Sequence, residues 1–171
     1  MAPLAAELKV GDKVVYPAHG PGVIVSRERK VISGNEQVVY VLQMLHNGGT
    51  ILIPVAKVKS VGIRSPISLR EIERVYETLK DKVPLSPEPP EPWNRRHRQY
   101  RDKIKTGLIP EIVEVLKSLH QAGRTRELSL GERKILDTAM GLLVEEVSYA
   151  KDLKAEKIQR EIELLLGRRE A

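Results

Sequence analysis

Gln37-Val-Val-Tyr-Val-Leu-Gln-Met-Leu45 and Thr50-Ile-Leu-Ile-Pro-Val55 are two β-branched segments joined through Asn47-Gly48-Gly49. Side chains alternate across a strand, so each segment has one face that can be buried. Asn-Gly and Gly-Gly supply the positive φ that a tight turn needs. We therefore predict an antiparallel hairpin that turns at residues 47–49.

Shorter segments of the same character flank this hairpin. They lie at 14–16, 22–25 and 58–63, with turn residues at 18–22 and 33–35. Five short strands within about sixty residues are typical of a small, strongly bent antiparallel barrel of the SH3 or Tudor kind.

The pattern becomes helical after residue 66. Two capping boxes, Ser68-Leu-Arg-Glu71 and Ser129-Leu-Gly-Glu132, precede apolar residues at helical spacing. Further helices are expected at 93–105, 110–122 and 155–166. The sequence thus predicts an α+β protein, with a β-barrel at 1–66 and a compact all-α domain of about five helices at 67–171. A proline-rich segment at 84–92 lies within the second domain.

Composition excludes several classes of protein. The chain has 171 residues and no cysteine, so a thiol nucleophile and a disulfide framework are excluded. No apolar run approaches the ~20 residues that span a bilayer, and Met1–Val10 lacks the pattern of a signal peptide. We expect a cytoplasmic protein with no membrane partner.

Catalytic chemistry has little support in the sequence. The 4 histidines are far apart and no phosphate-binding glycine loop is present. Glu145 and Glu146 are adjacent on one helix, and we expect them to face solvent. The protein is therefore expected not to be an enzyme, and no cofactor, metal or small-molecule substrate is predicted.

Positive charge is concentrated in one short segment. The formal net charge is +6, and residues 93–107 alone hold 6 basic and 1 acidic side chains. On a helix, Arg95, Arg98 and Arg101 would form a solvent-facing row that reaches phosphate oxygens. Trp93, at the helix start, could wedge into or stack on DNA bases. The alternative is that Trp93 anchors the helix to the core and the arginines are only a solvated face.

The predicted hairpin offers a second candidate surface. Alternation places Val39, Val41 and Leu52 on its outer face, where they would form an exposed apolar patch. Such patches on a soluble module mark protein partners, and a strand can add at a sheet edge. The alternative is that the helical domain covers this face.

Together these segments resemble the bacterial CarD/CdnL family of transcription regulators, and most of all its myxobacterial CdnL branch. The resemblance extends from about Lys9 to Leu166. Its motifs are Val10-Gly-Asp-Lys-Val-Val-Tyr-Pro17, His19-Gly-Pro-Gly-Val23, Ile51-Leu-Ile-Pro54, Val61-Gly-Ile-Arg64, Trp93-Asn-Arg-Arg-His-Arg98, Ile104-Lys-Thr-Gly107, Glu114-Val-Leu-Lys117 and the segment from Leu128 to Ala139.

The resemblance implies a mechanism. In this family the N-terminal module is similar to the polymerase-interacting domain of the transcription-repair coupling factor and binds the β subunit of RNA polymerase. The helical domain contacts promoter DNA at the upstream edge of the melted region, where a tryptophan wedges into the minor groove. That mechanism makes this chain a nucleoid-associated regulator of initiation, and we expect a monomer.

The resemblance also implies site residues. Trp93 matches the family's wedge, and the basic DNA contacts fall on Arg95, Arg96, Arg98 and Arg133, to which the helical spacing adds Arg101. The polymerase contacts fall on Lys30, Leu52 and Pro54, to which the alternation adds Val39 and Val41. The actinobacterial branch has arginine where this chain has Leu52, so the contact here is expected to be apolar. The competing hypothesis is a general architectural nucleic-acid-binding protein that acts without polymerase.

Overall fold

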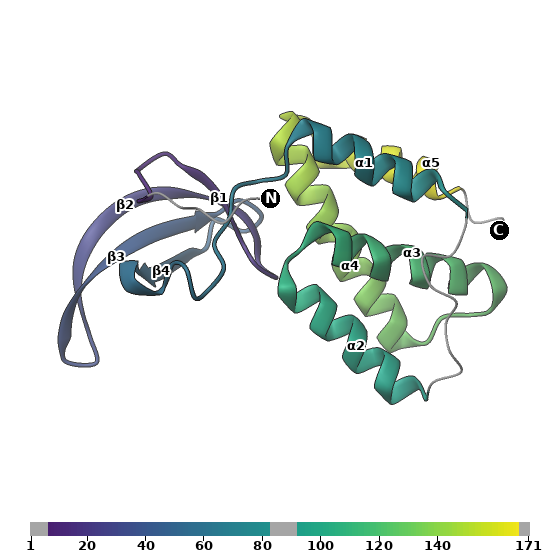
Figure 1. Cartoon of the computed structure of the whole chain (residues 1–171), viewed down its shortest axis with the longest axis horizontal. Helices are drawn as coiled ribbons and strands as arrows, with labels where there is room; N and C mark the ends of the chain where they lie inside the picture. Colours follow the sequence, from purple (N-terminus) through teal and green to yellow (C-terminus); the bar gives the residue numbers. More distant parts are fainter. Residues whose placement is uncertain (1–6, 83–91, 168–171) are drawn as a thin grey trace. The chain divides into compact units, whose positions relative to one another are not determined.

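The computed structural model describes residues 7–82 and 92–167 of the chain. The chain divides into two compact units, Met1–Pro66 and Ile67–Ala171 (Figure 1). The first contains the strands and the second contains the five α-helices, so the protein is α+β.

The first unit is a four-stranded antiparallel sheet in the order β1-β2-β3-β4. Its strands are β1 (Lys13–Tyr16), β2 (Gly20–Ile32), β3 (Asn35–Met44) and β4 (Thr50–Pro54). An isolated bridge pairs Val15 with Arg64, which brings the chain back against β1 after β4. The sheet is thereby bent toward closure, as small barrels are.

The predicted hairpin at residues 37–55 is confirmed. Val41 lies opposite Leu52, and Tyr40 lies opposite Ile53. Tyr40, Ile53 and the neighbouring Leu42 are at most 2% exposed and belong to the core of this unit. The side-chain alternation along β3 and β4 therefore points Tyr40, Leu42 and Ile53 into this core.

β2 and β3 form a longer hairpin than the sequence predicted (Figure 1). Ser33 (φ 52°) and Gly34 (φ 79°) make its two-residue turn, since successive positive φ angles match the twist of the flanking strands. Residues 26–32 pair along this hairpin. Residues 26–30 are all polar or charged and show no apolar alternation, which is why the sequence did not identify this part of β2 as a strand.

The expected strand at 58–63 is wrong. The chain forms a 3-10 helix, η1 (Val55–Lys57), then turns, and only Arg64 pairs with the sheet. Val58 has right-handed helical angles and Gly62 has a φ of 76°, neither of which a continuous strand accommodates.

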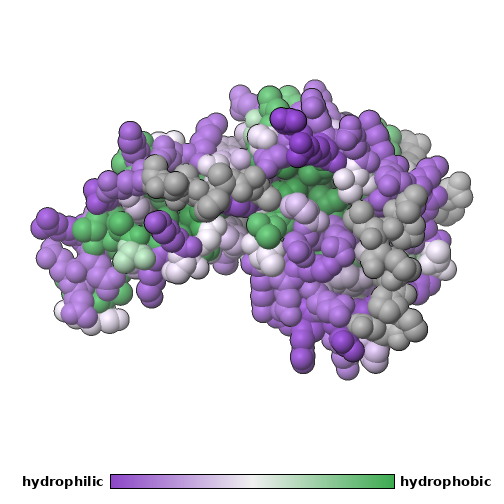
Figure 2. Space-filling model, viewed as in Figure 1, coloured by the Kyte–Doolittle hydropathy of each residue, from purple (hydrophilic) through white to green (hydrophobic). Residues whose placement is uncertain are grey.

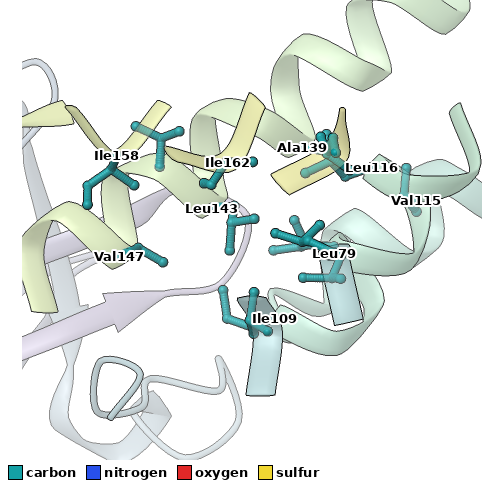
Figure 3. Packing of buried hydrophobic residues seen from close by; sticks show 14 of the residues in the cluster. Leu79, Ile109, Val115, Leu116, Ala139, Leu143, Val147, Ile158 and Ile162 are labelled. Atoms are coloured by element: carbon teal, nitrogen blue, oxygen red, sulfur yellow. The ribbon is translucent and has the colours of Figure 1, made fainter. Parts of the chain in front are cut away.

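The second unit packs five helices around one core. They are α1 (Leu69–Lys80), α2 (Trp93–Thr106), α3 (Ile109–Thr125), α4 (Leu130–Lys151) and α5 (Ala155–Leu166). Both predicted capping boxes are present, at the starts of α1 and α4. The core residues are aliphatic side chains from every helix, and Figure 3 shows those of α1, α3, α4 and α5 converging.

Two buried charges hold α1 at its ends. The Glu146 carboxylate accepts a hydrogen bond of 2.9 Å from the Ile67 N–H, just before α1. The Lys117 ammonium donates one of 3.0 Å to the Thr78 carbonyl, in the last turn. An anion at the helix start and a cation at its end both complement the helix dipole. Glu146 is 2% exposed, so the expectation that it faces solvent is wrong.

Candidate protein and nucleic-acid interfaces

α2 carries the basic segment on a well-defined helix. It begins after Pro92, with no side chain capping its first turn, and ends at Gly107, whose φ of 65° suits a left-handed cap. Ile104 is buried and Tyr100 packs against the core, so one side of the helix is fixed. The opposite side is therefore held toward solvent, and Figure 2 shows hydrophilic residues gathered over α2.

The arginine row predicted from helical spacing is exposed. Arg95, Arg98 and Arg101 are all solvent-exposed, while Arg96 is partly buried. Arg98 and Arg101 form no ion pair with any residue that the structure describes. Trp93 is the first residue of α2, which places its backbone at the start of this row; its side chain lies outside what is described.

Arg133 differs from Arg98 and Arg101 because its charge is engaged by described residues. Its guanidinium makes an ion pair of 2.5 Å with Glu127 and donates a second hydrogen bond of 3.1 Å to the Leu128 carbonyl. The neighbouring Lys134 is exposed and makes no ion pair with the described residues. Arg133, the basic position that the resemblance implies, is thus more constrained than Lys134.

A groove of about 370 Å³ lies between α2 and α4. Its walls carry four nitrogen-bearing side chains, His97, Arg101, Lys105 and Lys134, over a floor of Ile104 and Ile135. Of the described residues that line it, none is acidic. Sequence analysis missed His97, Lys105 and Lys134 as site residues; the i, i+4 spacing of His97, Arg101 and Lys105 was the available signal.

Glu132 fixes the start of α4 beside this groove. Its carboxylate is 3% exposed and accepts hydrogen bonds of 2.5 and 2.9 Å from the Arg126 guanidinium. The Arg126 hydrogen bonds, with those from Ser129, lower the pKa of Glu132 to about 2 against the cost of burial. Its negative charge is thus neutralised locally and does not face the groove.

The predicted polymerase contacts share one face of the sheet. In the β2–β3 register, Lys30 lies opposite Gln37, and Gln37 is two residues before Val39 on β3. In the β3–β4 register, Pro54 lies opposite Val39 and Leu52 lies opposite Val41. Side chains two residues apart on a strand point to the same side. The fold therefore brings Lys30, Val39, Val41, Leu52 and Pro54 together.

Exposure on this face is uneven. Leu52 is 45% exposed, and Val41 and Pro54 are partly buried. Val39 is 0% exposed, so its expected membership of an exposed patch is wrong. It lies on a central strand between Glu28 and Pro54, which flank it on both sides. The exposed feature is a narrower strip of Val41, Leu52 and Pro54, which we call the β4 strip.

Lys30 borders the β4 strip and forms an ion pair with Glu28. Its ammonium lies 2.9 Å from the Glu28 carboxylate, which also accepts a hydrogen bond of 2.7 Å from the Ser26 hydroxyl. The hydrogen bond from Lys30, then that from Ser26, lowers the pKa of Glu28. A partner that contacts Lys30 therefore meets a paired cation.

Two other features, a metal-ligating cluster and a membrane-spanning helix, are not found in the described part of the chain. No group of three or more metal-ligating side chains is found among residues 7–82 and 92–167. None of the described helices is both long and apolar enough to cross a membrane.

A small bent sheet with an apolar strip, followed by a five-helix unit with a basic helix, defines a two-unit α+β protein. Family models match both units in order: the CarD-like/TRCF RID domain over residues 8–67, and the CarD C-terminal domain over residues 74–163. The chain belongs to the CarD family.

The sequence of one relative agrees with that assignment. The chain is 32% identical over 154 residues to the "Putative transcription factor YdeB" of Bacillus subtilis, covering 88% of this chain and 97% of that protein. Among solved structures, it is similar to the N-terminal domain of Myxococcus xanthus CarD at 26% identity, covering 38% of this chain and 91% of that one, with a TM-score of 0.31. It is also similar to CdnLNt from the same organism at 43% identity, covering 40% and 96%, with a TM-score of 0.32.

Proposed function

We propose that this chain binds the β subunit of RNA polymerase through residues 1–66 and promoter DNA through residues 67–171, and so stabilises the open promoter complex. The coarser role, regulation of transcription, follows from its membership of the CarD family. The observation that carries the finer proposal is that each compact unit matches one family model, and the first of these is a polymerase-interacting domain type.

The β4 strip supports the polymerase contact. β4 is the last strand in the described sheet order, so its outer edge is the natural place for another chain to pair. Leu52 projects from this strand with almost half of its surface exposed. An apolar side chain beside an open strand edge gives a protein partner both backbone hydrogen bonds and apolar contact.

The row of exposed arginines on α2 supports the DNA contact; we call Arg95, Arg98 and Arg101 the α2 row. Three exposed arginines spaced three residues apart can donate charge-assisted hydrogen bonds to successive phosphate oxygens. The uncapped first turn of α2 adds backbone N–H groups and the positive end of the helix dipole. Trp93 starts the same helix, and the proposal assigns it the stacking contact with bases of the melted duplex.

The expected difference in affinity between the open and the closed promoter is large enough to regulate initiation. A protein that prefers the open promoter shifts the equilibrium only by its differential affinity for the two states. Base–aromatic stacking contributes about 1–3 kcal/mol, which is roughly tenfold to a hundredfold in bubble lifetime. Few phosphates are contacted, so affinity for DNA alone is expected to be weak. Attachment to polymerase raises the effective concentration of the helical unit at the promoter.

Co-purification with RNA polymerase and with its isolated β subunit tests the proposal. Tagged wild-type chain is expected to capture both, and Leu52→Arg is expected to lose them while retaining its helical circular dichroism. Val10→Arg is the matched control, because Val10 is also exposed in the same unit but lies before β1.

Two results would contradict the proposal. Equal capture of β by the wild type and by Leu52→Arg would remove the β4 strip as the docking surface. Failure of the wild type to capture polymerase, together with tight duplex binding and a steep salt dependence, would favour an architectural nucleic-acid-binding protein. The exposed arginines of α2 are the observation that favours this alternative function.

A further inference from the structure

We propose that Asn47 is a site of spontaneous deamidation, and that the folded β3–β4 turn slows this modification. The chain has 3 asparagines, Asn35, Asn47 and Asn94, and of these Asn47 alone precedes a glycine, Gly48. Glycine has no Cβ, so its backbone nitrogen is open to approach by the preceding side chain. The inference goes beyond the proposed function and involves neither polymerase nor DNA.

The reaction needs only the chain and water. The backbone nitrogen of Gly48 loses its proton and attacks Cγ of Asn47, so that a new C–N bond closes a succinimide ring. The C–N bond of the side-chain amide breaks, and its NH2 group leaves with that proton as ammonia. Water then adds to either carbonyl of the ring. One opening gives aspartate, and the other gives isoaspartate, in which the main chain passes through the former side chain.

Hydrogen bonds within the turn oppose this attack. The Gly48 N–H donates a hydrogen bond of 3.0 Å to the Met44 carbonyl, which retains the proton that the reaction must remove. The Asn47 Oδ1 accepts a hydrogen bond of 2.8 Å from the Gly49 N–H, as in an Asx turn. A Cβ built on Gly49 would lie 2.9 Å from that oxygen, whereas one on Gly48 would meet nothing within 4 Å. The side-chain amide is thus held against Gly49, and both bonds must open before the ring can close.

The turn is placed where it can open without the rest of the sheet. Asn47 and Gly48 are solvent-exposed, and neither is part of the core of this unit. Exposed turns open at a much lower free energy than core strands. The modification is therefore slow in the folded chain and proceeds each time the turn opens or the unit unfolds.

Isoaspartate at position 47 would disturb the β4 strip. It adds one carbon to the main chain, which lengthens the turn by about 1.5 Å. This turn is closed by the Met44 N–H, which donates a hydrogen bond of 2.8 Å to the Gly49 carbonyl, and it precedes the pairing of Val41 with Leu52. Loop length fixes the register of a hairpin, so the longer turn weakens the pairing of β4 with β3. Aspartate leaves the main chain unchanged and keeps an acceptor oxygen for Gly49.

Peptide mass spectrometry of the full-length chain, incubated at mildly alkaline pH, gives the first test. Deamidation is expected at Asn47, about tenfold or more slowly in buffer than in guanidinium chloride. Labelling by an isoaspartyl methyltransferase is expected on the same peptide. Asn35 and Asn94 are internal controls, because glutamate and arginine follow them. Equal rates at Asn47 in the folded and the unfolded chain would overturn the protection, and an unmodified Asn47 in the unfolded chain would overturn the site.

Gly49→Ala tests whether the hydrogen bonds of the turn provide this protection. Its Cβ would displace the Asn47 Oδ1, while the reacting pair Asn47-Gly48 is retained. Deamidation of the folded variant is expected to be several times faster than that of the folded wild type, and the two unfolded chains should react alike. Hydrogen exchange along the β2–β3 pairing checks that the variant remains folded. A folded rate equal to that of wild type would show that the Asn47–Gly49 hydrogen bond does not slow the reaction.

Hydrogen exchange of β4 measures the consequence of the modification. Chain that has been unfolded, aged and refolded, and then enriched in isoaspartate at position 47, is expected to exchange the backbone amides of β4 faster than wild type. Asn47→Asp is the matched control, because it carries the same charge on an unaltered main chain, and its β4 amides should exchange as in wild type. Equal exchange in the isoaspartyl chain and in Asn47→Asp would refute the effect on β4.

Discussion

Replacing Glu132 by glutamine tests how the start of α4 is stabilised. The native carboxylate is 3% exposed and accepts two hydrogen bonds from Arg126, while the Ser129 N–H donates to it at 2.8 Å. Glutamine keeps one acceptor oxygen for the capping box but loses the charge. The variant should therefore lose the ion pair with Arg126 and keep the local helix start.

The magnitude follows from the pKa of Glu132, which is lowered from 4.5 to about 2 by Arg126 first and by Ser129 second. A shift of this size corresponds to roughly 3 kcal/mol at neutral pH. Arg126 is 41% exposed and solvent screens its charge, so we expect about 2 kcal/mol. For a helical unit of this size, such a loss lowers the melting temperature by about 10 °C.

The pH dependence has a defined sign. A carboxylate whose folded-state pKa is depressed stabilises the fold above its ordinary pKa, and loses that contribution as the pH falls toward the folded value. Wild type should exceed Glu132→Gln in stability at pH 7, and the difference should shrink between pH 4.5 and pH 2.

Urea unfolding followed by circular dichroism at helical wavelengths measures this difference. Glu73→Gln is the control, since Glu73 is exposed on α1. A stability difference for Glu132→Gln that is absent at pH 7, or that is unchanged at pH 2.5, would refute the assignment of the pKa shift to the ion pair.

Three further predictions concern the interface and the fold. Trp93→Ala should abolish promoter activation in a reconstituted transcription assay while leaving capture of polymerase intact, and activation at wild-type level would contradict the wedge. Lys117→Met should destabilise the helical unit by about 1–3 kcal/mol in urea unfolding, because it removes the donor to the Thr78 carbonyl; an unchanged midpoint would show that the bond contributes nothing. Gly22→Ala should destabilise the sheet, because its Cβ would lie 2.7 Å from the Gln43 carbonyl oxygen; unaltered thermal unfolding of the first unit would show that the strands can separate to accept it.

The sequence predicted those elements whose signals are local. The 47–49 turn, the two capping boxes and the apolar stripes each lie within one segment, and the structure contains them all. The strand at 58–63 failed because Gly62 and the helical angles of Val58 break it, while its apolar composition suggests a strand.

Tertiary contacts account for what the sequence could not predict. Glu146 is buried because its carboxylate accepts from Ile67, which lies 79 residues away. Lys134 entered no prediction, because its place in a groove depends on the packing of α2 against α4. Val39 shares a face of the sheet with Val41 and Leu52, as the alternation predicted. Its burial could not be predicted, because it depends on the neighbouring residues of β2 and β4.

Covalent connection of the two units is central to the proposed function, and it can be tested by mixing variants. Leu52→Arg should fail to dock on polymerase, and Trp93→Ala should dock but fail to hold the melted DNA. Each chain in the mixture retains the surface that the other lacks. If activation requires attachment to polymerase to raise the local concentration of the helical unit, the mixture should remain inactive in a reconstituted assay, since linkage of binding modules acts only within one molecule. Restored activation at equal micromolar concentrations would show that the helical unit reaches the promoter without its own β4 strip, as an architectural protein would.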